Sequence, residues 1–499
     1  MRIQQFLDHH GIAANPFVDE DAQTDLVFKS SCIRSTFHPS WEKIYGDPSE
    51  PATAVVFGEK GSGKTAIRLQ VVRHLMDYNA EHPEQQVFVV QYDDFNPFLD
   101  HFRNRILGGR RRAEKALDHW RLWDHMDAVL SLGVTQLVDR ILDNKQVRYP
   151  AARDEALPVE TLDAAQVRDV MLLAACYDQS TAENSLQRWR RLRRKLKFST
   201  WRSKWDVVVG ISVTVVVIGL LVGLGIARDE WSLARTPWPY MAIAAGWLPR
   251  VWRLARWWWM AWRINRNTRT LTRSTKLLWR TLLSFPGNKI VGQPLPSVPR
   301  TDDRYELLAK LQGVLRSLKM DGILVLVDRV DEPYLVNGAT ERMRALVWPM
   351  LDNKFLKHPG LGLKMLLPIE LERLLDRESR DFHQRARLDK QNLIPSLNWT
   401  GQSLYDMANA RLAACSAEGR SPRITELFEG VDEHRLIDSF ATLRVPRHLF
   451  KFMYRLFTTH CNSHTEESPV WKIAPATFES VLALYQREQE AFERNVGAG

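Results

Sequence analysis

The residues best suited to chemistry form a glycine-rich run early in the chain. Residues 58–65 read Gly-Glu-Lys-Gly-Ser-Gly-Lys-Thr and follow the apolar run Thr53 to Phe57, which suits a buried parallel strand. Glycines let the backbone wrap so that successive N–H groups point at phosphate oxygens. The helix expected from Ala66 to Leu75 would direct its positive end there too. The spacing therefore predicts a nucleoside triphosphate site, and a chance glycine loop is the less favoured interpretation.

Two side chains of this run have specific expected roles. Lys64 would bring a positive charge to the β- and γ-phosphates, and Thr65 would place its hydroxyl on Mg²⁺. The residues expected to bind the nucleotide are Gly58, Glu59, Lys60, Gly61, Ser62, Gly63, Lys64, Thr65 and Ala66.

An acidic cluster far downstream is the expected partner of the glycine loop. The continuous apolar run Ile323 to Val327 predicts a buried strand, and Asp328 follows directly after it. Asp328 is expected to hold the metal through water or Thr65, while Glu332, or with less support Asp331, would orient and deprotonate the attacking water. The alternative is a buried strand followed by a solvated acidic turn.

The pattern from Val327 to Glu332, an apolar strand followed by Asp-Arg-Val-Asp-Glu, resembles the acidic box of the signalling (STAND) P-loop NTPases that include the NACHT and KAP groups. The KAP group is the closer likeness, because its members carry transmembrane helices between the phosphate loop and the acidic strand. KAP proteins commonly have a second Asp-Arg-type ending after the acidic strand. This chain has Asp331-Glu332 there, so it departs from the KAP pattern at that position. The resemblance covers roughly 50–95 and 315–450, and it implies ATP as the nucleotide and a prokaryotic role such as phage exclusion.

The resemblance also implies a cation over the γ-phosphate. The run Arg444 to Leu449 resembles the Pro-Arg turn that opens a lid helix in related ATPases, so Arg447 is expected to reach that phosphate. Arg387 and Lys390 are further candidates for this cation, which they would supply to the site of a neighbouring subunit. The alternative for all three residues is an ordinary exposed charge. In related ATPases the strand equivalent to 361–367 ends in a polar residue that senses the γ-phosphate. This chain has Pro-Ile-Glu there, so the resemblance does not supply a γ-phosphate sensor at that position.

An apolar segment long enough to cross a membrane lies in the sequence between the glycine loop and the acidic cluster of the expected site. Val207 to Ala227 has no charge and about twenty residues, enough to cross a bilayer as a helix. Trp238 to Pro249 would complete a hairpin if Arg250 and Arg253 extend to the interface, and a buried core hairpin is the alternative. Basic residues on both flanks predict that both ends face the cytoplasm; they are Arg188, Arg190, Arg191, Arg193, Arg194, Lys195, Lys197, Arg202, Lys204, Arg250, Arg253, Arg256, Arg263, Arg266 and Arg269.

Composition narrows the class of protein. A net charge of +10 would favour nucleic acid, but this charge brackets the apolar segment, so nucleic acid is the less favoured partner. The 4 cysteines show no C-x-x-C spacing, which disfavours a disulfide framework or structural zinc and indicates buried thiols in a reducing compartment. The N-terminus lacks the apolar region of a signal peptide.

The expected fold class is α/β: a doubly wound parallel-sheet P-loop core with a helical insertion, a transmembrane helical hairpin and a C-terminal helical lid domain. The expected divisions are an N-terminal lead-in at 1–50, the first half of the core at 51–96, the helical insertion at 97–205, the hairpin at 206–260, a basic helix and linker at 261–315, the second half of the core at 316–400 and the lid at 401–499.

The sequence thus predicts a membrane-anchored, cytoplasm-facing ATPase of the cell (inner) membrane, with both terminal parts cytoplasmic and with ATP and Mg²⁺ as cofactors. It would couple ATP hydrolysis to signalling or remodelling at the membrane. A slowly hydrolysing, ATP-gated scaffold and a DNA-handling ATPase are the alternatives. Expected partners are membrane lipid and an unidentified protein client, and a homo-oligomer is left open. The sequence contains no clear motif that reads the base, so ATP is preferred over GTP by resemblance alone.

Overall fold

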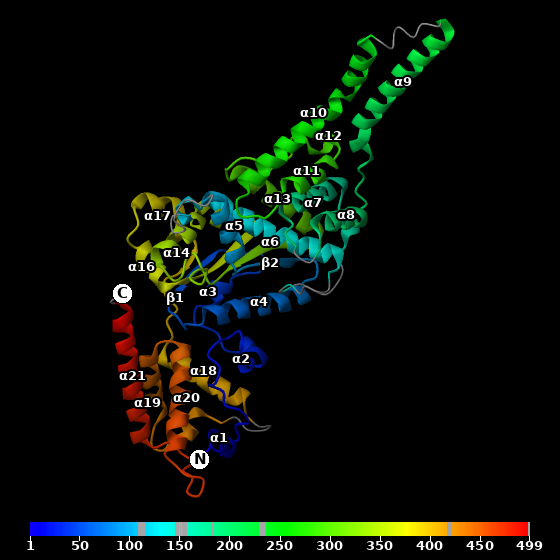
Figure 1. Ribbon diagram of the computed structural model, residues 1–499. Helices are drawn as coiled ribbons and strands as arrows, with labels where there is room; N and C mark the ends of the chain where they lie inside the picture. Colours follow the sequence, from blue (N-terminus) through cyan, green and yellow to red (C-terminus); the bar gives the residue numbers. More distant parts are fainter. Residues whose placement is uncertain are drawn as a thin grey trace. The chain divides into compact units, whose positions relative to one another are not determined.

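The computed structural model describes residues 1–107, 116–144, 149, 151, 157–180, 183–228, 236–416 and 422–497 (Figure 1). The chain forms two compact units, which are described separately below. Unit 1 comprises Met1–Asp93, Pro150–Arg153 and Gly322–Gly499, and unit 2 comprises Asp94–Tyr149 and Asp154–Asp321.

Unit 1 is built on a five-stranded parallel sheet, which confirms the expected α/β class. Its strands are β1 (Ala54–Gly58), β2 (Gln86–Tyr92), β3 (Met320–Val327), β4 (Leu361–Pro368) and β5 (Asn392–Ile394), in the order β2-β3-β4-β1-β5. β1 and β4 are buried along their whole length, as expected for strands covered on both faces. The weak apolar run at 392–397 forms a strand only as far as Ile394, because Pro395 has no N–H to donate to a neighbour.

The strand order places segments that are distant in the sequence side by side in the sheet. β1 pairs on one side with β4, with Ala54 opposite Lys364, and on the other side with β5. The connection after β1 leads to the β2 edge, whereas the connection after β4 leads to β5 in the opposite direction. Ligands of open α/β sheets bind at the carboxyl ends of strands where the direction reverses in this way. The structure therefore places the expected site at the carboxyl ends of β1, β3 and β4.

Helices cover the sheet of unit 1. The apolar residues Ile67, Val71 and Leu75 of α4 (Lys64–Glu81) pack on one face, in a core shared with all five strands. α16 (Ile369–Leu375) contacts β1 and β4. Between residues 26 and 386, the other α-helices of unit 1 are α2 (Leu26–Ser30), α3 (Trp41–Tyr45), α14 (Thr340–Val347), α15 (Asn353–Leu356) and α17 (Arg380–Ala386).

The C-terminal part of unit 1 is helical, as expected. It contains α18 (Gly401–Ala414), α19 (Glu433–Leu443), α20 (Pro446–Asn462) and α21 (Pro475–Gly497) (Figure 1). The start of the chain joins this core: Phe6 in α1 (Ile3–His9) and Phe17 both lie against Phe457. The lead-in expected at 1–50 is therefore shared, since its first residues pack with the C-terminal helices and α3 packs on the sheet.

Apart from the start of β3 at Met320 and Asp321, the regular secondary structure described in unit 2 is helical. The unit contains α5 (Asn96–Leu107), α6 (Leu122–Leu142), α7 (Ala164–Tyr177), α8 (Ser185–Lys195), α9 (Trp205–Arg228), α10 (Trp238–Asn267), α11 (Thr275–Leu283), α12 (Gly287–Ile290) and α13 (Asp302–Ser317).

Buried ion pairs hold these helices together and correct one expectation. Arg188 of α8 binds Asp139 and Asp178, and Arg269 binds Asp124, at 2.6 to 2.8 Å. The sequence assigned both arginines to the basic flanks of a membrane segment. Arg188 is instead buried, and Arg269 is directed at a fully buried carboxylate, because a charge in a protein interior needs a partner.

Helices α9 and α10 pack tightly against each other. A Cβ atom on Gly210 would lie 2.9 Å from the Trp247 ring, and one on Gly246 would lie 2.8 Å from Val213. Trp247 Nε1 donates a hydrogen bond to Thr214 Oγ1 at 3.1 Å. At the other end of the pair, Asp206 accepts hydrogen bonds from two arginines of α10, Arg250 and Arg253, each at 3.0 Å.

Among the described residues, α9 is the one helix that is long and apolar enough to cross a membrane, over Trp205–Leu224. α10 does not meet that criterion, since Pro249 interrupts it and basic residues follow. Residues 229–235, between the two limbs of the expected hairpin, lie outside the described residues.

Candidate functional site

The glycine loop connects the end of β1 with the start of α4, as the sequence predicts. Gly61 and Gly63 adopt φ of +91° and +94°, a region that favours glycine. A Cβ atom on Gly61 would lie 2.7 Å from Cβ of Arg447, so this position also needs the absence of a side chain. The N–H of Ser62 donates to Glu59 O at 3.1 Å and closes the turn.

Lys64 folds back across this loop. Its ammonium donates to the carbonyl oxygens of Gly58 at 2.8 Å and Glu59 at 2.9 Å. Burial lowers the pKa of Lys64, and the nearby carboxylates of Asp331 and Asp328 oppose that change. The positive charge is therefore held at the mouth of the loop, beside two acidic groups.

Asp328 lies beside the loop although it is 263 positions away in sequence from Thr65. The Thr65 hydroxyl donates to Asp328 Oδ2 at 3.4 Å, and Asp328 is 2% exposed at the end of β3. The same oxygen lies 3.2 Å from Arg68 Nε, and Arg68 also pairs with Asp93. Burial raises the pKa of Asp328, whereas Arg68 lowers it. The structure thus brings together the two residues expected to hold the metal.

The next acidic residues follow a sharp turn. Arg329 has φ of 59°, and its Nε lies 3.5 Å from a carboxylate oxygen of Glu332. The Glu332 side chain is 58% exposed. Partial burial raises the pKa of Glu332, and Arg329 opposes this rise. Asp331 and Glu332 both line the same pocket as Lys64, so either could contact a water molecule there.

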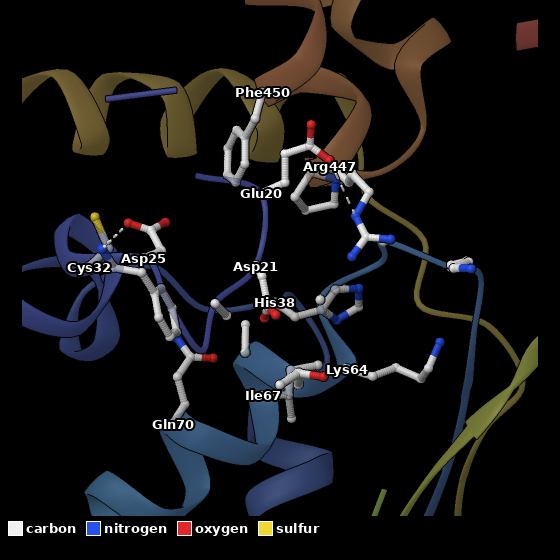
Figure 2. Close-up of a pocket in the computed structure, with 18 of the residues that line it drawn as sticks. Glu20, Asp21, Asp25, Cys32, His38, Lys64, Ile67, Gln70, Arg447 and Phe450 are labelled. Carbon is white, nitrogen blue, oxygen red and sulfur yellow. Dashed lines mark hydrogen bonds and ion pairs between the residues drawn. The ribbon is translucent and has the colours of Figure 1, made fainter. Parts of the chain in front are cut away.

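The start of α20 places Arg447 over the loop. Pro446 occupies the first turn of this helix, and the N–H of Arg447 approaches Gly61 O at 3.4 Å. Arg447 Nε lies 3.9 Å from a carboxylate oxygen of Glu20, which Lys451 approaches at 3.4 Å (Figure 2). The structure brings Arg447 to the pocket as expected, but Arg387 and Lys390 are not among the described residues that line it.

These residues surround one pocket of about 200 Å³ in unit 1 (Figure 2). One part is polar and contains the glycine loop, Asp328, Asp331, Glu332 and Arg447. The other part was not expected from the sequence and is formed by the N-terminal segment, α4 and the C-terminal helices; its residues are Asp25, Phe28, Cys32, Thr36, His38, Ile67, Gln70, Trp399, Met407, Arg411 and Phe450.

A weak signal for this second part existed in the sequence. Asp25, Phe28, Cys32 and Thr36 are spaced by three and four residues, which places them on one side of a helical segment. Nothing local indicated what that side would face. The contacts that fix it are long-range, since Gln70 Nε2 donates to Thr36 O at 2.6 Å and Arg411 Nη1 lies 2.6 Å from Asp25 Oδ2.

The donor set at Thr65 and Asp328 suits a hard divalent cation. No cluster of three or more His, Cys, Asp or Glu residues with metal-binding geometry occurs in the described ranges. Mg²⁺ does not require such a cluster, because it is commonly held by one or two carboxylates, waters and substrate phosphates. A buried carboxylate next to a threonine hydroxyl fits that pattern.

No family model, curated protein or solved structure matches this chain. Its function is therefore inferred from the residues and their geometry.

Proposed function

We propose that this chain is a membrane-anchored P-loop ATPase of KAP type that hydrolyses the β–γ bond of ATP on the cytoplasmic side of the membrane. The observation that carries the proposal is the convergence of Thr65 and Asp328, at 3.4 Å, beside a glycine loop that opens α4. A phosphate-binding loop and a buried carboxylate at the carboxyl ends of two strands of one sheet, β1 and β3, are the two parts that Mg²⁺-dependent phosphoryl transfer requires.

Each residue then has a defined task. The N–H groups of the glycine loop and the N-terminus of α4 bind the phosphates, and Lys64 exchanges its carbonyl partners for phosphate oxygens. Thr65 and Asp328 would hold Mg²⁺, which when bound neutralises negative charge on the β- and γ-oxygens. Glu332 orients the attacking water and accepts its proton. Arg447 approaches the transferred phosphoryl group after release from Glu20.

The proposed membrane anchor is supported by α9 together with the sheet. Residues 54–58 and 361–368 are adjacent strands, so they lie on the same side of any membrane. The chain between them must cross an even number of times. If α9 crosses, α10 is the return limb, and the packing of Gly210 and Gly246 supports this pairing. The ion pairs of Asp206 offset the charge of Arg250 and Arg253.

The test is phosphate release from ATP by the protein in lipid nanodiscs, after confirming that detergent is needed for extraction. Wild type should turn over ATP, and Lys64→Ala should abolish turnover because the phosphates lose their mobile cation. Lys357→Ala is the control, since the Lys357 side chain is exposed and is not among the described residues that line the pocket. Equal activity in wild type and Lys64→Ala would contradict the proposal.

A second candidate is an ATP-gated membrane scaffold that hydrolyses slowly. It is favoured by the exposure of Glu332 and by the contact between Arg447 and Glu20, which together leave the site less than fully assembled for hydrolysis. Tight ATP binding that depends on Lys64, without phosphate release, would support this candidate over the ATPase.

A further inference from the structure

The second part of the pocket continues from the glycine loop along α4. Lys64, Ile67 and Gln70 follow one another at intervals of three residues, so they lie along one side of the helix. Gln70 is about 9 Å from Lys64 along the helix axis. Figure 2 shows Ile67 and Gln70 on the side of the pocket that also contains Cys32 and Asp25. If the phosphates of a nucleotide bind at the glycine loop, its sugar and base would occupy this second part of the pocket.

Arg411 contributes a buried hydrogen-bond donor to this wall. The residue is 2% exposed, and its guanidinium lies over the Phe450 ring, 4.3 Å from the centroid. Its Nε donates to Pro16 O at 2.7 Å, and its Nη1 lies 2.6 Å from Asp25 Oδ2. Its Nη2 is buried and has no hydrogen-bond partner within the described part of the chain. A buried N–H group without an acceptor is unfavourable, and a ligand that supplies one would remove that cost.

Gln70 contributes an oriented acceptor. It is also 2% exposed, and its Nε2 donates to Thr36 O at 2.6 Å. Because the Gln70 nitrogen donates to a backbone carbonyl, the reverse orientation of the carboxamide would place two oxygens together, so the amide is oriented with its oxygen as the acceptor for a ligand. The wall therefore offers one acceptor, from Gln70, and one donor, from Arg411, among the apolar side chains of Phe28, Ile67 and Met407.

We propose that Gln70 and Arg411 read the base of the bound nucleotide and select adenine, an inference that rests on the proposed nucleotide site. The exocyclic amine at C6 of adenine donates to the Gln70 oxygen, and the adjacent ring nitrogen N1 accepts from Arg411 Nη2. Guanine and hypoxanthine carry a carbonyl at C6 and a hydrogen on N1, so that an oxygen would face the Gln70 oxygen and an N–H would face Arg411 Nη2. The apolar side chains would cover the faces of the purine ring.

The test uses diphosphates, which the proposed reaction does not consume. Calorimetry would compare Mg²⁺ complexes of ADP, of IDP, which has a carbonyl in place of the amine, and of inorganic pyrophosphate, which has no base. Wild type should bind ADP at least about ten-fold more tightly than IDP. In Gln70→Leu this ratio should fall to about three-fold or less, and the affinity for pyrophosphate should remain within about three-fold of wild type.

Arg411 needs a paired change, because its removal alone would leave Asp25 buried without a partner. The double variant Asp25→Asn/Arg411→Met should bind ADP about ten-fold more weakly, with pyrophosphate binding retained. Arg435→Met, which removes an exposed arginine of α19, is the matched control and should leave both affinities unchanged.

The outcomes separate this inference from the proposed function. Equal affinity of the wild type for ADP and IDP would overturn the base reading, even if pyrophosphate still bound in a manner that depends on Lys64. Loss of pyrophosphate binding in Gln70→Leu would show that the change acts on the phosphate site and would also overturn it. If wild type bound neither ADP nor pyrophosphate, both the inference and the proposed nucleotide site would fail.

Discussion

Glu332 is the residue on which turnover should depend most specifically. It lines the pocket beside Lys64 but makes no contact with the glycine loop among the described interactions. Glu332→Gln should therefore lower the rate of phosphate release by about 10²- to 10⁴-fold, as expected for loss of a general base, while ATP affinity changes by less than about three-fold. Glu341→Gln, with a side chain that is 72% exposed, serves as the control. Unchanged turnover in Glu332→Gln would remove this residue from the reaction.

The protonation of Glu332 also predicts a pH dependence. Its pKa is raised above 4.5 by burial, so the rate should rise with pH as the carboxyl loses its proton. Arg329 opposes that rise in pKa. Arg329→Asn, which tolerates the positive φ, should move the acidic limb of the pH–rate profile to higher pH. The measurement is kcat/KM between about pH 4.5 and 8, and a shift to lower pH would contradict it.

Among the individual site residues, the sequence predicted those that belong to a local sequence motif. Thr65 follows the glycine loop at the start of α4 and Asp328 directly follows β3, so both could be assigned without knowing the sheet order. Arg411 and Gln70 could not, because their roles depend on how the N-terminal segment packs between α4 and the C-terminal helices. Arg411 also differs in no local feature from the exposed arginines elsewhere in the chain.

Among the elements, β4 carries an unusual buried lysine in the centre of the sheet. Lys364 is 1% exposed, and its ammonium donates to Tyr45 O at 2.9 Å and Ala52 O at 2.8 Å. Burial lowers its pKa from 10.5 to about 8. Because the folded-state value is the lower one, the folded state gains stability as pH rises through about 8 and loses it as pH falls.

Raising the pH from about 7 to about 9 should therefore increase the free energy of unfolding of wild type by about 1 kcal/mol through Lys364. Lys364→Met should lack this component, so its stability should change less over the same interval. Urea titrations in detergent micelles, followed by tryptophan fluorescence, would measure the difference. A wild-type increase that Lys364→Met reproduces in full would assign it to other groups.

The pairing of α9 and α10 can be tested by its glycines. A side chain on Gly246 would meet Val213, whereas a Cβ atom added to Gly219 of α9 would have no other atom within 4 Å. Gly246→Leu should destabilise the helix pair by about 1 to 3 kcal/mol through overpacking, and Gly219→Leu should have little effect. Thermal unfolding in nanodiscs would compare the two. Equal effects of both substitutions would contradict the observed packing.

The sequence predicted most elements of unit 1 because their strands are continuous apolar runs. It did not predict the end of β5 at Ile394, although Pro395 is a local reason for it. It also assigned Arg188 and Arg269 to the basic flanks of the apolar segment, since basic residues are usually exposed and the buried partners Asp139 and Asp124 lie 49 and 145 positions away.

For the whole molecule, the proposed hairpin predicts where individual residues lie. A cysteine at Thr236 should react with a membrane-impermeant maleimide from outside intact spheroplasts, whereas one at Ser468 should react only after lysis. The 4 native cysteines are buried and should not interfere. Labelling of both positions from outside, or of neither, would rule out a hairpin with cytoplasmic termini.

The pairing of β1 also has a consequence for biosynthesis. β1 has β4 and β5 as its neighbours, and Ala54 pairs with Lys364, about 310 residues later. At about 5–20 residues per second, a ribosome needs roughly 15 to 60 s to make that stretch. The glycine loop thus emerges long before its sheet can close, and the apolar segment emerges in between. Under the proposed function, a newly made chain would insert into the membrane before its nucleotide site could form, so that hydrolysis would begin only at the membrane.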